Sequence, residues 1–471
     1  MKRRDFFRRA ALGAAGIHFV TPALQGDTKV VSTENLYFGK KKKAKNIIFL
    51  VSDGMSQGTL TMSEIFLQKK HGRGSHWLQL YKENKVKRAL MDMASASSSV
   101  TDSAAASSSW GGGARVKNGS LNLGENGQEY LPIWQKFKKS GKKVGCVTTV
   151  PITHATPAGF CVVAKTRGEQ NEIARQYLDL RFDVMMGGGD KYFFNKEKGY
   201  DLYPDFLNMN YQVVRKTAEM HDTVHDKPVL GVFDYDGLPY ELDRQNIPEW
   251  KQNIPSLSDM TRKAIELMKD HPKGFCLQVE GGKVDWAAHA NDALALIYDQ
   301  VAFDEAIRVA IEFAEKDGNT LVIITTDHGN ANPGLYYGKN ADKNFESLFT
   351  ARHTTHYLLN QVDKSDDIHD LADKIKAFQG YSLEEDELRA ILKKYEEQEE
   401  KGSYNEYKLP YELYGQITRK HHSVHFGGTE HTADFTELAM FGPGSDHLPA
   451  FIKNTDLHYF MLEAAGVENK F

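Results

Sequence analysis

Residues 46–52 read NIIFLVS and are followed directly by Asp53-Gly54. The run is apolar at nearly every position, whereas a strand with one face in water alternates apolar and polar residues. An unbroken run of this length is typical of a parallel strand that is buried on both faces. The stretch therefore predicts a strand inside a parallel sheet, with Asp53 at its carboxyl end.

Similar apolar runs recur along the chain, and helical patterns lie between them. Further strands are predicted at 143–150, 182–186, 274–279, 320–326 and 436–441. Apolar residues at spacings of three and four predict helices at 171–180, 258–270, 290–316 and 456–465. Because strands and helices alternate, we predict an α/β fold, a three-layer sandwich with a central, mostly parallel sheet flanked by helices.

The composition is that of a globular protein. The chain has 471 residues, of which 41% are hydrophobic and 26% charged, so it can bury a large core and is not a disordered chain. A net charge of −4 gives no electrostatic reason to expect nucleic-acid binding. A mean hydropathy of −0.51 argues against a polytopic membrane protein. The cysteines at 146, 161 and 276 do not form a disulfide framework, and we expect buried thiols.

The N-terminus carries the pattern of an export signal. A basic segment that includes Arg3-Arg4 precedes an apolar stretch near residues 10–23, which is too short and too broken to span a bilayer. The arginine pair followed by Phe6-Phe7 resembles a twin-arginine signal, and the alternative is a basic tail. We predict a removable signal over 1–26, a periplasmic or secreted protein without a stable membrane span, and a single α/β domain over 27–471.

The segment 334–426 differs from the rest of the chain because it is polar, charged and rich in Tyr and His. Within it, 367–378 and 382–401 are predicted to be exposed helices with Glu/Lys pairing. We interpret the segment as a solvated insertion within the domain. Its histidines at 421, 422 and 425 could suggest an extra metal site, but a solvated, charged loop is the preferred interpretation.

Polar residues gather where the predicted strands end. They are Asp53, Glu280, Asp285, His289, Asp327 and His328. The carboxyl ends of parallel strands meet at one edge of a sheet, so these side chains should converge. Carboxylates and imidazoles without thiolates suit zinc, with magnesium at an all-oxygen position. Each fragment alone also fits a turn, a surface pair or a helix-surface contact, but their coincidence at strand ends favours a metal site.

Ser103 is a candidate nucleophile. It precedes a run of small residues and would lie at a helix N-terminus, where free N–H groups and the helix dipole favour anions. The alternative interpretation of Ser103 is a helix N-cap.

Seven motifs, in order along the chain, resemble the alkaline phosphatase family. They are VSDGM (51–55), VTDSAA (100–105), HATPAGF (154–160), MGGG (186–189), VEGGKVDWAAH (279–289), TTDHGN (325–330) and TEHTA (429–433). The spacings agree with the family too, since Ser103 lies 50 residues after Asp53 and Arg167 lies 13 after His154.

This resemblance implies a metal-dependent phosphate monoester hydrolase of broad specificity that acts on small phosphomonoesters. Ser103 would accept the phosphoryl group, and Arg167 would bind two phosphate oxygens. Asp53, Asp327 and His328 would hold one zinc ion, and Asp285, His289 and His431 a second. Asp53, Thr156 and Glu280 would hold magnesium. The insertion resembles the crown of vertebrate members, which implies a homodimer.

Two positions near the site depart from some branches of the family. His154 stands where enterobacterial members carry Asp, and Trp286 where they carry Lys, a combination similar to that of marine and cold-active members. Because imidazole tolerates zinc or cobalt, His154 leaves the identity of the third metal open. Replacing Lys by Trp should weaken binding of the phosphate product.

Two other functions remain as alternatives. Phosphodiesterases of the same superfamily usually carry Thr as nucleophile and lack the third-metal Glu, whereas this chain has Ser103 and Glu280. Sulfatases need a formylglycine precursor, which Ser103 within TDSAA does not match. A non-enzymatic phosphate- or metal-binding protein would be favoured if a ligand position were empty, but every expected position is filled.

Overall fold

The computed structural model describes residues 43–197, 199–363, 365–396 and 409–469. The described residues belong to one compact unit. The predicted export signal at 1–26 lies outside them. Within the described ranges, no helix combines the length and apolar character that crossing a bilayer requires.

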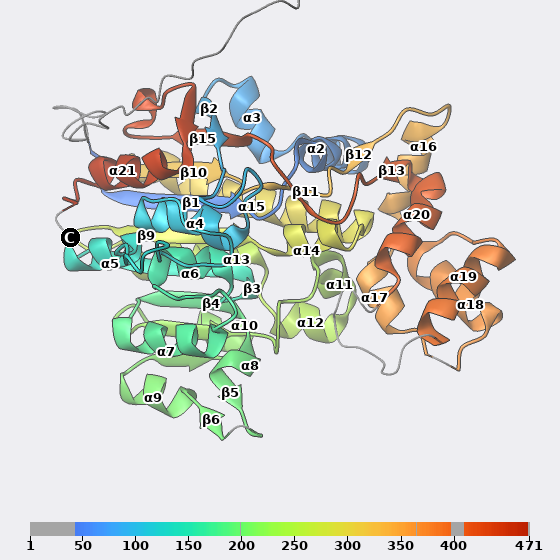
Figure 1. Cartoon of the computed structure of the whole chain (residues 1–471), viewed down its shortest axis with the longest axis horizontal. Helices are drawn as coiled ribbons and strands as arrows, with labels where there is room; N and C mark the ends of the chain where they lie inside the picture. The colour runs from blue at the N-terminus through green and yellow to red at the C-terminus, as the bar shows by residue number, and fades with distance from the viewer. Residues whose placement is uncertain (1–42, 198, 364, 397–408, 470–471) are drawn as a thin grey trace, which may run out of the picture. The chain divides into compact units, whose positions relative to one another are not determined.

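The described part of the chain is built on one ten-stranded sheet, and the predicted fold class is confirmed (Figure 1). All of its neighbouring strands pair in parallel except at β15, which is antiparallel to both of its neighbours. In spatial order the strands are β16 (Phe451–Lys453), β2 (Lys87–Asp92), β15 (Thr436–Phe441), β10 (Thr320–Thr325), β1 (Asn46–Ser52), β9 (Phe275–Gly281), β3 (Lys143–Pro151), β4 (Val184–Gly188), β8 (Val229–Val232) and β7 (Gln212–Val214).

Helices cover both faces of the sheet, as the unbroken apolar run of β1 requires. Ile48 and Leu50 of β1 belong to one core, whereas Ile47, Phe49 and Val51 belong to the other. The first core is covered by α2 (Gln57–His71), α3 (His76–Lys82), α13 (Leu257–Met268) and α15 (Ala293–Asp317). The second is covered by α4 (Ser103–Gly112), α5 (Ile133–Lys139), α6 (Ala155–Cys161), α7 (Gln170–Leu180) and α21 (Asn454–Ala465). The three cysteines are buried and free, as predicted.

Shorter elements complete the layers. They are α8 (Asp190–Phe193), β5 (Phe194–Asn195), β6 (Tyr200–Asp201), α9 (Tyr203–Asn208), α10 (Thr217–His221), α11 (Glu241–Asn246), α12 (Pro248–Asn253) and α14 (Lys283–His289). Two more short strands follow β10, β11 (Gly329–Asn330) and β12 (Gly334–Leu335). The short strand β14 (His431–Thr432) pairs with β11 and lies just before β15.

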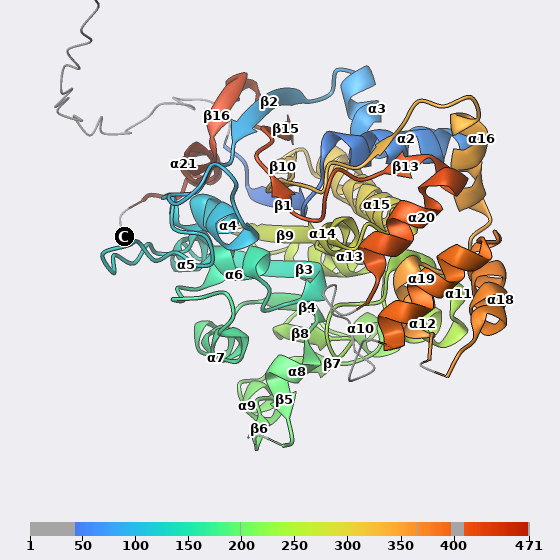
Figure 2. The ribbon, with the colours of Figure 1, turned by 45° about the vertical axis from the view of Figure 1, so that its right-hand side comes forward.

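The segment 334–426 forms a separate group of helices, which Figures 1 and 2 place beyond the carboxyl ends of the sheet strands. Its ends pair with each other, since β12 is antiparallel to β13 (Val424–His425). Between them lie α16 (Ala341–Phe345), the 3-10 turn Glu346–Phe349, α17 (Thr355–Asn360), α18 (Ile368–Gln379), α19 (Glu385–Glu396) and α20 (Tyr411–His422).

Two predictions about this segment were wrong. The helices expected to be exposed bury one face each, because Leu371 and Ile375 of α18 pack with Leu388 and Ile391 of α19 in a small core of their own. The expected histidine-rich loop is the end of α20 and the strand β13. His422 is buried there, which lowers its pKa to about 3. The helices were taken as exposed because the Glu and Lys residues on one face of each helix obscure the apolar residues on its other face in the sequence.

Candidate active site

The sheet register brings the predicted strand-end residues together. Val51 of β1 pairs with Thr325 of β10 on one side and with Glu280 of β9 on the other. Asp53 therefore lies between Glu280 and the Asp327-His328 pair that follows β10. The backbone N–H of Gly54 donates to Asp327 Oδ1 at 3.0 Å, which ties the two strand ends together.

Ser103 is the first residue of α4, and the alternative of an N-cap is wrong. The N-cap is Asp102, whose side chain accepts a hydrogen bond from the N–H of Ala105. The Ser103 hydroxyl is thus not used for capping. It lies at 3.3 Å from His328 Nε2, and Ser103 is 1% exposed. A hydroxyl is therefore presented at a helix N-terminus, beside the carboxylates and imidazoles of the strand ends.

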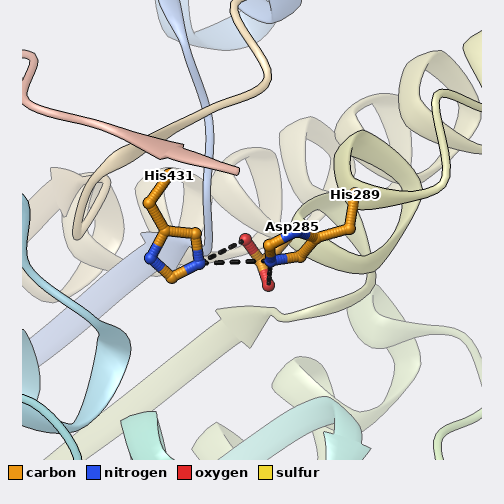
Figure 3. Close-up of side chains that lie close together, drawn as sticks. All are labelled: Asp285, His289 and His431. Atoms are coloured by element: carbon orange, nitrogen blue, oxygen red, sulfur yellow. Dashed lines mark hydrogen bonds and ion pairs between the residues drawn. The ribbon is translucent and has the colours of Figure 1, made fainter. Parts of the chain in front are cut away.

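Asp285, His289 and His431 form the first group of converging ligand atoms (Figure 3). One turn of α14 carries Asp285 and His289, whereas His431 is brought in from β14 by its pairing with Asn330 of β11. His289 Nε2 lies 3.4 Å from Asp285 Oδ2, and His431 Nε2 lies 3.5 Å from Asp285 Oδ1.

The hydrogen bonds of these two histidines show that their Nε2 lone pairs face each other. The Nδ1 of His289 contacts the carbonyl of Thr429, and the Nδ1 of His431 contacts the carbonyl of Thr101. A carbonyl only accepts, so each Nδ1 carries the proton and each Nε2 carries a lone pair. Burial and His328 lower the pKa of His431 to about 4, which keeps this imidazole neutral. The Nε2 atoms of His289 and His431 lie 3.2 Å apart beside the Asp285 carboxylate, and this arrangement of ligand atoms fits a bound cation.

The second group consists of Asp53, Asp285 and His328, with Asp327 adjoining it. His328 Nε2 lies 3.1 Å from Asp327 Oδ2 and 3.6 Å from Asp53 Oδ1. Burial and the carboxylates of Asp327, Asp285 and Glu280 raise the pKa of Asp53 well above its ordinary value. So many carboxylates sealed from water repel one another, and a divalent cation would remove this repulsion.

The third group consists of Asp53, His154 and Glu280. His154 Nδ1 and Glu280 Oε1 lie 3.9 Å apart, and both are buried without a hydrogen-bond partner in the described part of the chain. Thr156 donates to Asp53 Oδ2 at 3.2 Å. The sequence placed His154 beside this position, and the structure agrees, because its ring lies within reach of Asp53 and Glu280. Its Nε2 accepts a hydrogen bond from Arg167, so the neutral ring carries its proton on the Nδ1 that faces Glu280. A buried carboxylate oxygen without a hydrogen-bond partner, such as Glu280 Oε1, fits a role as a metal ligand.

Arg167 lies in the loop before α7 and contacts Asp102, the residue next to Ser103. Its guanidinium donates to Asp102 Oδ2 at 3.1 Å and to His154 Nε2 at 3.0 Å. These two contacts hold the Arg167 side chain beside Asp102 and His154, with 29% of the side chain exposed. Trp286 lies further out, with its ring centroid 6.1 Å from that of His154.

Sequence reasoning missed three residues that support this site. Asp102 holds Arg167 and caps α4, Asn330 donates to Asp285 Oδ1 at 2.7 Å, and Thr148 donates to Glu280 Oε2 at 2.5 Å. Asp102 and Asn330 stand inside the motifs VTDSAA and TTDHGN, so their motif context could have identified them. Thr148 lies within a strand run and carries no such signal.

The chain is similar to known proteins over nearly all of its described length. The family model described as alkaline phosphatase matches residues 44–467. Alkaline phosphatase 4 of Bacillus subtilis is 29% identical, over 97% of this chain and 97% of that protein. The alkaline phosphatase of Escherichia coli is 31% identical, over 65% of this chain and 74% of that protein. The crystal structure of Thermus thermophilus alkaline phosphatase superposes with a TM-score of 0.84 at 28% identity, covering 91% of this chain and 92% of that one.

Proposed function

The chain belongs to the alkaline phosphatase family and is a phosphomonoesterase, and on this premise we propose that it works through a phosphoserine intermediate on Ser103. The observation that supports this most directly is the position of the Ser103 hydroxyl. It lies at the N-terminus of α4 without capping the helix, 3.3 Å from His328 Nε2. The substrates are small phosphate monoesters, and the products are inorganic phosphate and an alcohol.

The same proposal includes two zinc ions and one magnesium ion. Asp53, Asp327 and His328 would hold one zinc, Asp285, His289 and His431 the other, and Asp53, Thr156 and Glu280 the magnesium, with His154 beside it. The donor chemistry supports this, because imidazole lone pairs and carboxylates converge without thiolates. When bound, such ions act as Lewis acids that stabilise negative charge on the attacking and leaving oxygens.

The residues of the chain then have defined tasks. Ser103 loses its hydroxyl proton and its Oγ attacks phosphorus, so that one P–O bond forms while the bond to the alcohol breaks. The departing alkoxide takes up a proton from water and leaves as the alcohol, and the proton of Ser103 passes to solvent. Arg167, held by Asp102, binds two non-bridging phosphate oxygens with its planar guanidinium. Water then cleaves the phosphoserine, which releases inorganic phosphate and restores the Ser103 hydroxyl.

A direct test of this function is a comparison of monoester with diester hydrolysis. We expect the metal-loaded protein to hydrolyse p-nitrophenyl phosphate at alkaline pH much faster than bis-p-nitrophenyl phosphate. Chelation should abolish the activity, and zinc plus magnesium should restore it, because the buried carboxylates need cations to hold the site together. Faster cleavage of the diester would favour the phosphodiesterase alternative. Phosphate binding without turnover would favour a binding protein.

The third position should change its metal preference when His154 is replaced. In His154→Asp the imidazole beside the third position becomes a carboxylate, and additional oxygen donors favour magnesium over zinc. We expect elemental analysis after growth in mixed metals to find a higher ratio of magnesium to zinc in the variant. Trp286→His, beside the site but outside the three donor groups, is the matched control and should leave the ratio unchanged. An unaltered ratio in His154→Asp would exclude His154 from the third position.

We also propose that the protein is exported to the periplasm or secreted, and that it is a homodimer. The first proposal rests on the basic and apolar pattern of residues 1–26, and the second on the position of the 334–426 insertion. Light scattering that returned the mass of a single chain would contradict the dimer, and retention of the mature enzyme in the cytoplasm would contradict export.

A further inference from the structure

A cavity of about 470 Å³ adjoins helix α14, on a different face from the one that carries the metal donors. Asp285 and His289 lie one turn apart and face the metal site. Lys283 and Trp286 are three residues apart and line the cavity. The remaining walls come from the loop 234–240 after β8, from α11 and α12, and from α17 of the insertion together with Gln361 after it. Its volume lies within the range of about 300 to 1,000 Å³ typical of small-molecule sites.

Trp286 joins this cavity to the phosphate-binding region. Its ring is nearly perpendicular to that of His154, with an interplanar angle of 77°. His154 in turn accepts a hydrogen bond from Arg167, the proposed phosphate ligand. On the cavity side, the loop packs against the same ring, since a Cβ atom at Gly237 would lie 2.8 Å from Trp286 Cζ3. Trp286 therefore adjoins both the proposed phosphate-binding region and the wall of the cavity.

We propose that this cavity is the subsite for the leaving group. It selects phosphate monoesters whose alcohol carries a flat, uncharged ring with N–H donors, the chemistry of a nucleobase. The inference rests on the proposed function, because it assumes that phosphate binds between Ser103 and Arg167. It adds a substrate preference to an active site that would otherwise accept any alcohol.

The lining of the cavity supports a flat ring as the occupant. Its aromatic members are Tyr235, Tyr240, Trp250, Trp286, His356 and Tyr357. Tyr235 is 64% exposed, an unusual position for a large aromatic side chain, and it lines the cavity with the Lys191 ammonium 5.9 Å from the centre of its ring. Aromatic faces bind flat rings by stacking, and this stacking depends little on which base is present.

The charges of the cavity favour N–H donors and disfavour anions. Asp234, Asp236 and Asp243 line it, against the single cation Lys283. The Lys283 ammonium lies 3.8 Å from the centre of the Tyr240 ring and 4.6 Å from that of Trp286, so it is held within the wall. Lys191 pairs with Asp236 at 2.6 Å, and both oxygens of Asp243 accept hydrogen bonds from Thr354. Asp234 Oδ1 accepts from the N–H of Tyr235, so Asp234 Oδ2 is the acceptor that we assign to a ligand donor.

The first experiment compares substrates that differ in the leaving group. We expect Tyr235→Ala to lower kcat/KM for uridine 5′-monophosphate by about tenfold while glycerol phosphate, which has no ring, is unaffected. Tyr235→Phe retains the ring and should behave as wild type. Tyr337→Ala removes another exposed tyrosine that does not line the cavity, and serves as the control. An equal loss for both substrates, or none, would overturn the proposal.

The second experiment tests the charge. Orotidine 5′-monophosphate differs from uridine 5′-monophosphate by one carboxylate on the ring. Wild type should prefer the uridine compound by about fivefold, since a like charge at contact distance costs about that much even in water. Asp234→Asn should reduce the preference for uridine 5′-monophosphate over orotidine 5′-monophosphate. Equal use of both nucleotides by wild type would overturn the subsite. Failure to hydrolyse any of the three monoesters would instead contradict the proposed function.

Discussion

Ser103→Ala should lose turnover of p-nitrophenyl phosphate by about 10³-fold or more, because removal of a nucleophile takes away the covalent route rather than weakening it. The residue lies at the meeting point of the donor groups and is 3.3 Å from His328 Nε2, but it belongs to none of the three metal-binding groups. Metal content should therefore match wild type, and elemental analysis of the purified variant would check this.

The matched control for this change is Ser109→Ala. Ser109 is on the same helix and equally buried, but its hydroxyl donates to the carbonyl of Ala105 within the helix. We expect Ser109→Ala to keep nearly full activity. If Ser103→Ala retained full activity with its metals in place, the phosphoserine intermediate would be wrong. If it lost its metals as well, Ser103 would be contributing to metal binding.

Asp53→Asn should strongly lower both metal affinity and activity, because Asp53 belongs to two of the three donor groups. Removing its charge should lower metal affinity at both positions by about 10²-fold or more. Mutation of a residue that only hydrogen-bonds to a metal ligand already lowers metal affinity by about 10- to 100-fold. Activity should fall with it. His431→Asn touches only one group and should lower the content of one metal. Elemental analysis that found equal losses in the two variants would contradict the shared role of Asp53.

The same substitution should act in the opposite direction on the metal-free protein. Burial and three neighbouring carboxylates raise the pKa of Asp53, so the folded chelated protein loses stability as the pH rises and Asp53 ionises. Asp53→Asn removes the ionisable group, and with it this loss of folding stability. We expect the chelated variant to unfold about 2 °C above chelated wild type at alkaline pH. A lower Tm would show that the carboxylate stabilises the fold without metal.

The pattern of apolar residues along the chain predicted the positions of the central strands and helices closely. The strand at 46–52 matches β1 at both ends, because a lysine and an aspartate bound an unbroken apolar run. The helix predicted at 258–270 differs from α13 by one or two residues at each end. The helices α18 and α19 were located approximately but taken as exposed, since their buried face shows only when the two pack together.

The sequence by itself determined the fold class, the family, and the residue types at the strand ends, because apolar runs and motifs are local properties of the chain. Only the tertiary structure decided which donors share a position. It brought His431 to Asp285 through the pairing of β14 with β11, brought the His154 ring within reach of Asp53 and Glu280, and gave Asp102 rather than Ser103 the capping role. These outcomes depend on register and on contacts between distant segments, which local propensity does not encode.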